Sequence, residues 1–316
     1  MRPYPLGCLK YGIAACVLFL GFGCSESEKG AKSEAISPSS SDGSDFIGAG
    51  LPEAPLGAAA GDPIADHYIV SFRPEQIDAR AREAARGKST GSFAASSASG
   101  KRAAMQSVLG AAFSPSQAAG KSSAAHGSGE VVEVFEHVYA GLVRLDAKGI
   151  EALRAQPEVL SVDPDVVVVV NDTSANPDTE VRALATQASP TWGLDRIDQA
   201  ALPLDGQYRY SRSGAGVSAY IIDSGIRADH PDFGGRVVPG ATTVTPTTLP
   251  STEDCRGHGT HVAGTVGSAT WGVAKEVRLV AVRVLDCDGR GTTAGVVAAI
   301  NWVTANAQRP AVVNMS

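Results

Sequence analysis

The chain has 316 residues, of which 43% are hydrophobic and 19% charged, and its formal net charge is −6. This length is enough for about two domains. A net negative charge does not attract the phosphate backbone of nucleic acids, so we expect no nucleic-acid partner.

The first 24 residues have the layout of a secretory signal. Arg2 and Lys10 give a positive start, an apolar stretch runs from Ile13 to Phe22, and small residues and Cys24 close it. The apolar stretch is well short of the ~20 residues that span a bilayer. Gly23 followed by Cys24 is also similar to a bacterial lipoprotein cleavage site, which would place a lipid anchor on Cys24 before maturation. Plain signal cleavage is the alternative, and both predict a secreted protein.

Residues 25–64 are rich in Ser, Gly, Ala and Pro. Such a composition buries too little apolar surface to fold by itself, so we expect a disordered linker.

Residues 65–170 predict an α+β domain of the ferredoxin-like type. The strands and helices alternate in the order strand, helix, strand, strand, helix, strand, with a Ser/Ala/Gly-rich insertion in the middle. In chain order we expect a strand at 67–72, a helix at 74–88, two strands within 130–146, a helix at 147–157 and a strand at 159–170. The insertion at 88–128 has a helical pattern near 101–110.

Residues 171–186 are polar and broken by proline, which predicts a processing linker, and residues 187–316 form the last predicted domain. Strands and helices alternate in it, which favours α/β architecture with a mostly parallel sheet. We expect strands at 216–226, 277–286 and 311–316, and helices at 257–268 and 291–307.

Asp223 and His258 are the candidates for catalysis. Asp223 ends an apolar strand, and the carboxyl ends of parallel strands are where such sheets carry their active sites. His258 lies between Gly257 and Gly259, which we expect to leave room for a substrate beside the ring. Imidazole suits a general base at neutral pH, and a buried carboxylate can orient it. In isolation, an Asp after a strand is more often a turn or cap residue than a catalytic one, and a lone His near a helix start is more often a cap or a surface group.

Alternatively, His258 and His261 bind a metal ion, because the predicted helix at 257–268 could present both imidazoles on one face. They lack the i,i+4 spacing and the intervening Glu of a zinc-protease helix, which weighs against it.

The motifs D-S-G at 223–225, G-H-G-T-H-V-A-G at 257–264 and P-A-V-V-N-M-S at 310–316 occur in that order. From about Ala185 to Ser316 the chain resembles the subtilisin-like serine proteases of the proteinase K/aqualysin branch, and residues 65–170 resemble their inhibitor-type propeptide. The resemblance implies a truncated subtilisin-like parallel sheet with flanking helices. It also implies Asp223 as orienting carboxylate, His258 as general base and His261 as a structural histidine.

Cys255 and Cys287 are the two cysteines beyond the signal segment, an even pair in an exported protein, and they match a disulfide of the aqualysin branch.

The resemblance also implies substrate-binding residues. Gly289, Arg290 and Gly291 match the edge strand that pairs with an extended peptide, and Ser316 matches a wall of the specificity pocket. The family usually has a small residue at the position of Arg290. Arg290 therefore either adds a charge near a distal subsite or is a solvated loop residue. The family's nucleophile motif G-T-S-M-A and its oxyanion-hole motif A-A-G-N occur nowhere in the sequence. We therefore expect an N-terminal fragment that is inactive as given.

The stretch 192–207 contains four side chains with the oxygen ligands that calcium prefers, and some relatives carry a calcium site with this pattern. They are Asp195, Asp198, Gln199 and Asp205. Alternatively, the acids simply stabilise the start of a helix. No organic cofactor is expected.

The sequence predicts the precursor of a secreted serine endopeptidase that acts on polypeptides through an acyl-enzyme, with its own propeptide as inhibitor and folding aid. The alternative is a propeptide-type protease inhibitor or chaperone that carries an inactive remnant of the protease.

Overall fold

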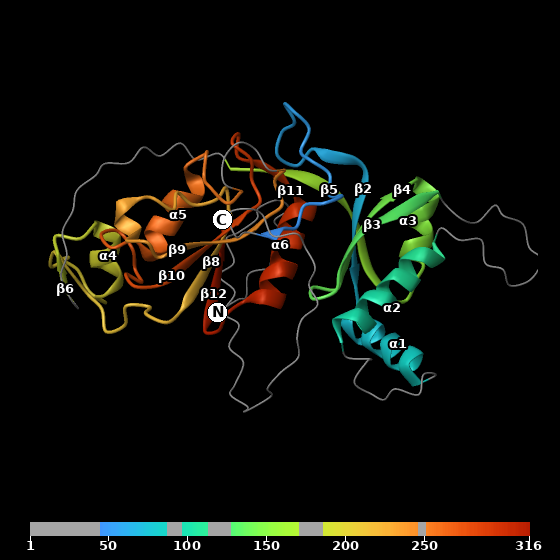
Figure 1. The fold of residues 1–316 in the computed structure, drawn as a ribbon, viewed down its shortest axis with the longest axis horizontal. Coiled ribbons are helices and arrows are strands. Elements are labelled where there is room, and N and C mark those ends of the chain that lie inside the picture. The colour runs from blue at the N-terminus through green and yellow to red at the C-terminus, as the bar shows by residue number, and fades with distance from the viewer. Residues whose placement is uncertain (1–44, 87–96, 113–127, 171–185, 246–250) are drawn as a thin grey trace, which may run out of the picture.

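The computed structural model describes residues 45–86, 97–112, 128–170, 186–245 and 251–316, which form two packed units (Figure 1). The predicted signal at 1–24, including Cys24, and nearly all of the processing linker at 171–186 lie outside the described residues.

The N-terminal unit is an antiparallel sheet covered by helices, as the pattern at 65–170 predicted. Its strands lie in the order β5-β2-β4-β3, which is the ferredoxin-like order. The strands are β2 (Pro63–Phe72), β3 (Gly129–Phe135), β4 (Ala140–Leu145) and β5 (Val159–Val169), and the helices are α1 (Pro74–Arg86), α2 (Ala98–Ala111) and α3 (Ala147–Arg154). Helix α2 is the helix predicted within the insertion.

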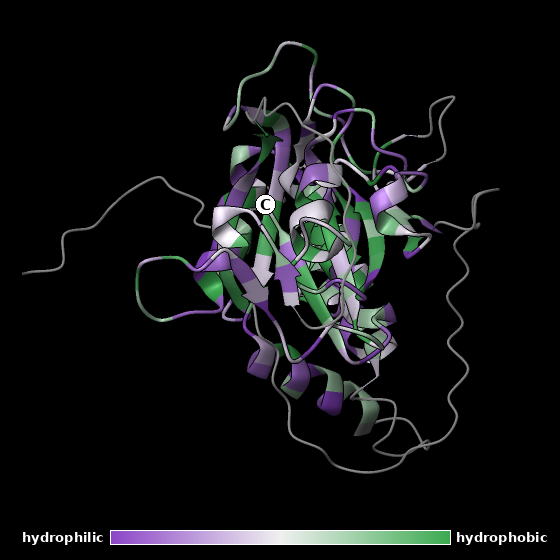
Figure 2. Ribbon diagram, turned by 90° about the vertical axis from the view of Figure 1, so that its left-hand side faces the viewer, coloured by the Kyte–Doolittle hydropathy of each residue, from purple (hydrophilic) through white to green (hydrophobic). Residues whose placement is uncertain are grey.

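Apolar side chains from both layers fill the core of this unit. Val70 and Phe72 on β2 pack with Met105 and Leu109 on α2 and with Leu153 on α3, all nearly inaccessible to solvent. Each such side chain contributes about 1.5–3 kcal/mol when fully buried. Figure 2 shows the whole molecule from the side of the C-terminal unit, with hydrophobic residues on the central strands and hydrophilic residues on helices and loops at the periphery.

The C-terminal unit is built on a parallel sheet in the order β1-β9-β10-β8-β12, in which β1 is the short strand Asp45–Phe46. Its main strands are β8 (Ser218–Asp223), β9 (Val237–Thr242), β10 (Arg278–Arg283) and β12 (Ala311–Met315), and its longer helices are α5 (His258–Gly267) and α6 (Thr293–Asn306). Smaller elements are β6 (Thr186–Ala188), α4 (Trp192–Ile197), β7 (Gln207–Arg209), the 3-10 helix η1 (Pro231–Phe233) and β11 (Arg290–Thr292).

Successive residues of β8 face opposite sides of this sheet. Tyr220 and Ile222 pack in one core with Ala299 of α6, while Ala219 and Ile221 pack in another with α5. Both faces are therefore covered, which explains why β8 and β10 are almost continuously apolar.

The interpretation of residues 25–64 as a disordered linker is wrong for its last part, whereas 25–44 lie outside the described residues. Strand β1 (Asp45–Phe46) joins the parallel sheet beside β9. The sequence pattern did not predict β9, because Pro239 and Gly240 interrupt its apolar residues. A polar, Gly- and Ser-rich composition indicates only that a segment cannot fold alone. Residues 45–64 are ordered because backbone groups in this segment hydrogen bond to strands of the two units.

The two units share a strand pairing and a core. β5 runs antiparallel to β11, and Asp165 Oδ1 accepts a hydrogen bond of 3.0 Å from the backbone N–H of Ala294, at the start of α6. Ile69, Phe135 and Leu142 of the N-terminal unit lie in one buried cluster with Ala294 and Ala298.

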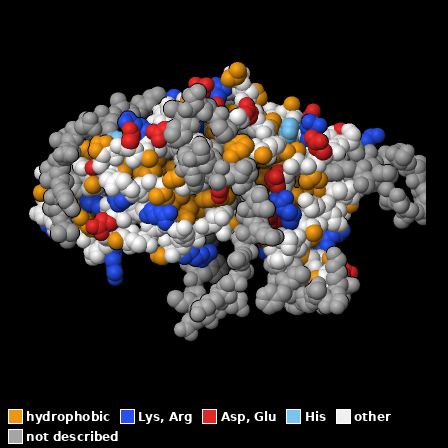
Figure 3. All heavy atoms as spheres, viewed as in Figure 1, with side chains coloured by type: hydrophobic (Ala, Val, Ile, Leu, Met, Phe, Trp, Pro, Cys, Tyr) orange, Lys and Arg blue, Asp and Glu red, His pale blue; other side chains and the backbone are white. Residues whose placement is uncertain are grey.

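Strand β12 is the last strand of the sheet among the described residues, and Val312 on it is 41% exposed. Figure 3 shows hydrophobic side chains gathered over the middle of the molecule, where Figure 1 places β12 and α6. None of the described helices is long and apolar enough to cross a membrane.

Candidate active site

Asp223 and His258 meet at the carboxyl end of β8. The two carboxylate oxygens of Asp223, Oδ1 and Oδ2, lie 2.8 and 2.9 Å from Nδ1 of His258. The Asp223 side chain is fully buried and that of His258 is 13% exposed. With Nδ1 bound to the carboxylate, Nε2 is the ring nitrogen left to exchange a proton, which is the arrangement of a carboxylate-oriented general base.

Glycines allow this approach. Helix α5 begins at His258 directly after Gly257, whose φ of 96° is the left-handed conformation that favours glycine. A Cβ on Gly259 would lie 2.2 Å from the carbonyl oxygen of Gly225, so α5 packs against the end of β8 only because Gly259 has no side chain. The expectation that Gly259 leaves room for substrate is therefore wrong, because the space beside it is filled by the protein.

Asp254 organises the loop before His258, and the sequence reasoning missed it. Its Oδ1 accepts hydrogen bonds from the backbone N–H groups of Arg256 and Gly257, and its Oδ2 accepts from Thr260 N and Oγ1. Ser224, next to Asp223, donates its hydroxyl to Asp254 Oδ1 at 2.9 Å. An acid shortly before a helix start was the available signal, since such acids bind the free N–H groups of the first turn.

Burial and hydrogen bonding act in opposite directions on Asp223. Burial raises the pKa of Asp223 above its ordinary value of 3.8, while the hydrogen bonds from His258 and the Ser224 N–H lower it, and burial dominates. The ionised carboxylate that orients His258 is thus held at a cost in stability.

The structure pairs Cys255 with Cys287, which are 32 residues apart. Closing a loop of this length contributes about 3–4 kcal/mol in the chain-entropy account. The disulfide joins the loop before His258 to the loop that precedes β11. Arg283, 1% exposed, lies beneath it and donates to the carbonyl of Leu285 and to Cys255 Sγ.

The strand predicted to bind peptide is paired with the end of the N-terminal unit. Gly291 lies opposite Val168, and the Val170 N–H donates to the Gly289 carbonyl at 3.0 Å. A Cβ on Gly291 would lie 2.3 Å from the Val284 carbonyl oxygen, so this strand needs glycine there. An extended segment added to a sheet edge is how such a strand would also hold a peptide.

Arg290 and Ser316 both have hydrogen-bond partners within the chain. The Arg290 N–H binds Asp286 Oδ1 at 2.8 Å, and its guanidinium donates to the Pro55 carbonyl at 3.4 Å. Ser316 is exposed after β12 and its Oγ donates to Asn314 Oδ1 at 2.8 Å, so its hydroxyl hydrogen bonds to Asn314 and not to His258.

The four predicted calcium ligands form a hydrogen-bonded turn. Asp195 Oδ2 accepts from the Gly206 N–H, and Asp198 Oδ2 accepts from the Arg209 N–H. The Gln199 amide donates to two backbone carbonyls, and Asp205 is paired with the Arg209 guanidinium at 2.7 Å. Within the described part of the chain, no group of three or more His, Cys, Asp or Glu side chains is arranged to hold a metal ion.

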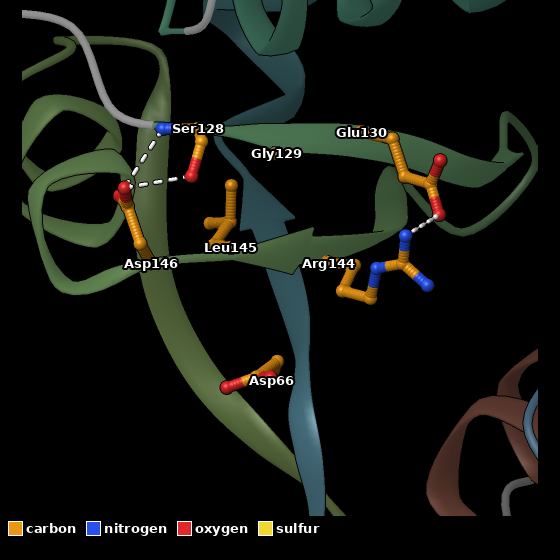
Figure 4. Close-up of a pocket in the computed structure, with 7 residues that line it drawn as sticks. All are labelled: Asp66, Ser128, Gly129, Glu130, Arg144, Leu145 and Asp146. Atoms are coloured by element: carbon orange, nitrogen blue, oxygen red, sulfur yellow. Dashed lines mark hydrogen bonds and ion pairs between the residues drawn. The ribbon is translucent and has the colours of Figure 1, made fainter.

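A separate polar hollow lies on the N-terminal unit, between β2, β3 and β4 (Figure 4). Three of its charged groups have partners there: Arg144 binds Glu130 at 3.0 Å, and Asp146 accepts from the backbone N–H and the hydroxyl of Ser128. These pairs hold the ends of β3 and β4 together, and no residue of the Asp223–His258 site lines the hollow.

Comparison with known protein families gives one match for each unit. Residues 67–171 match the peptidase inhibitor I9 family, and residues 214–316 match the subtilase family.

Curated relatives match the same regions. The chain is 57% identical over 139 residues to an extracellular serine proteinase of Thermus sp. (strain Rt41A), across 44% of this chain and 33% of the relative. It is 46% identical over 188 residues to alkaline serine exoprotease A of Vibrio alginolyticus, across 59% of this chain and 34% of the relative. The chain thus spans about a third of the length of these relatives.

Among solved structures, a cold adapted subtilisin-like serine proteinase matches 40% of this chain and 45% of its own, at 51% identity and a TM-score of 0.38.

The buried carboxylate predicts a pH-dependent effect of Asp223→Asn. The amide removes a buried charge and keeps an acceptor for His258, so we expect the free energy of unfolding at neutral pH to rise by on the order of 1 kcal/mol. A carboxyl group whose native pKa is raised destabilises the fold above that pKa and has no effect below its ordinary value of 3.8. The gain should therefore be full at neutral pH and vanish in acid.

Chemical unfolding of the parent and of Asp223→Asn, from neutral pH to below pH 3.8, measures the difference between their free energies of unfolding. Asp288→Asn is the control, because Asp288 is exposed, and it should change little. An Asp223→Asn variant less stable than the parent at neutral pH would contradict the prediction.

Proposed function

We propose that this chain belongs to the precursor of a secreted serine endopeptidase, because residues 214–316 match the subtilase family and residues 67–171 match the peptidase inhibitor I9 family. The observation that carries the proposal is the contact between Asp223 and His258 at the end of β8. Substrates are polypeptides, hydrolysed through an acyl-enzyme.

In this mechanism His258 is the general base and Asp223 holds it in place. Nδ1–H of His258 donates to the Asp223 carboxylate, so Nε2 is free to take a proton from a serine hydroxyl and to return it to the leaving amine. We propose that the serine is supplied by a segment outside these 316 residues. The absence of G-T-S-M-A from the sequence and the bond between Ser316 and Asn314 support this. This chain alone would then be inactive.

The N-terminal unit acts as an intramolecular inhibitor in this proposal. Val167, Val168 and Val169 pair with β11, in the place where an extended substrate would add to the sheet. Cleavage would follow in residues 171–186, with the mature enzyme beginning near Ala185. The two family matches in one chain favour this precursor over an inhibitor that carries an unused remnant.

We also propose that the turn between α4 and β7 binds a calcium ion, because two buried carboxylate oxygens there lack a hydrogen-bond partner among the described residues. The two oxygens are Asp195 Oδ1 and Asp198 Oδ1. Calcium takes six to eight oxygen ligands, and Gln199 and Asp205 offer further oxygens nearby, once Asp205 releases Arg209. The ion would stabilise the turn between α4 and β7 and take no part in the chemistry.

Thermal unfolding of the 316-residue chain with and without calcium tests that proposal. We expect calcium to raise the Tm of the parent and of Asp229→Asn, an exposed-site control, but not that of Asp198→Asn. A Tm that calcium does not change, or one that rises equally in Asp198→Asn, would contradict it.

The proposed activity is tested on the precursor extended along its reading frame beyond Ser316. We expect His258→Ala to lower kcat for a peptide substrate by about 10⁴-fold or more and to stop cleavage within 171–186. His261→Ala is the matched control on the same helix and should retain most activity, whereas a metal hydrolase would lose it in both variants.

The 316-residue chain should show no hydrolysis. Hydrolysis by this chain that depends on His258 would overturn the proposal of an external serine, and activity of the longer His258→Ala variant would overturn the role of His258.

A further inference from the structure

Residues 45–56, here called the N-terminal strap, precede the residues that match the inhibitor family and play no part in the function proposed above. In Figure 1 the blue segment leaves the upper end of β2 and runs back beside α6, into the C-terminal unit. The strap therefore spans from the inhibitor unit to the sheet that carries Asp223.

The backbone of the strap continues this sheet. Asp45 lies opposite Ala241 and Phe46 opposite Thr242, in parallel pairing. The Ile47 N–H donates to the Thr242 carbonyl at 2.9 Å. β9 would otherwise end the sheet with unpaired N–H and C=O groups, and the strap satisfies part of that edge.

Side chains of the strap bind α6 and the shared core. Trp302 on α6 donates its indole Nε1–H to Asp45 Oδ2 at 2.8 Å. Ile47 and Leu51 pack against the buried cluster formed by the sheet of the N-terminal unit and the first turns of α6. The strap thus contacts the C-terminal unit through a polar anchor as well as through apolar packing.

The other end of the strap lies over the proposed peptide-binding strand. The Pro55 carbonyl accepts from the guanidinium of Arg290, the first residue of β11. Directly after the strap, the Gly61 N–H donates to the Val167 carbonyl and the Val167 N–H donates to the Asp62 carbonyl, both at 2.9 Å. Val167 belongs to the segment of β5 that pairs with β11.

We propose that the strap is a second docking element of the inhibitory N-terminal region, separate from the inhibitor domain, whose binding site is the outer edge of β9 with Trp302. The proposal rests on the proposed function in so far as the N-terminal region inhibits a protease. After the cut in 171–186, the N-terminal piece holds the protease part at two sheet edges, β11 and β9. Its release then requires the strap to leave as well.

The experiment uses the full chain with the recognition sequence of a foreign protease placed within 171–185. After cleavage the C-terminal piece is immobilised, and the dissociation rate of the N-terminal piece is measured. Deletion of residues 1–56 removes the strap, and deletion of residues 1–44 is the matched control. We expect the first deletion to accelerate dissociation by about tenfold to a hundredfold and the second to leave it unchanged.

A pair of point variants repeats the comparison without truncation. Ile47→Asp places a charge in the shared core and should accelerate dissociation, whereas Ala49→Asp, at an exposed position of the strap, should not. Equal rates for the two deletions, or for the two point variants, would overturn the proposal.

No hydrolysis by this chain enters the measurement, so a failure of the proposed protease activity leaves its outcome intact. Immediate separation of the two pieces in every variant would instead overturn docking by both the inhibitor domain and the strap.

Discussion

The hydrogen bond between Asp223 and His258 joins the carboxyl end of β8 to the start of α5, and it requires a carboxylate to be buried between them. A carboxylate without exposure to water is stable only where polar groups surround it, and this one is bound by the imidazole and by a backbone N–H. Asp254 hydrogen bonds to the loop that positions the His258 ring, and the Cys255–Cys287 disulfide joins that loop to the loop before β11. Burial of Asp223 lowers stability, and the hydrogen bonds around it offset only part of that cost.

The two units are joined largely through strand edges. β5 occupies the edge of β11, and β1 occupies the edge of β9, so the N-terminal region contacts the C-terminal unit at two separate edges. Unpaired strand edges attract other strands, and here both partners come from the same chain. Such contacts depend on backbone groups, which every residue carries, and this is why residues 45–56 show so little of their role in their composition.

Much of the fold followed from periodicity in the sequence. The alternation at 67–72 and the apolar run before Asp223 predicted β2 and β8, and the motif around His258 predicted that it lies beside Asp223. β9 was missed because Pro239 and Gly240 mask a strand that gains its stability from its neighbours. The Gly259 contact with the Gly225 carbonyl joins residues far apart in the chain, a relationship that no local pattern contains, whereas Asp254 binds backbone N–H groups within six residues of itself.

The tautomer of His258 in the 316-residue chain shows whether Asp223 orients the imidazole ring. Nitrogen-15 NMR of the labelled ring distinguishes a protonated Nδ1 from a protonated Nε2. At a pH where the ring is neutral, the account predicts the proton on Nδ1, bound to Asp223, with Nε2 free to act as a base, and it predicts that Asp223→Ala removes this preference. A proton on Nε2, or a preference for Nδ1 that survives Asp223→Ala, would contradict the account.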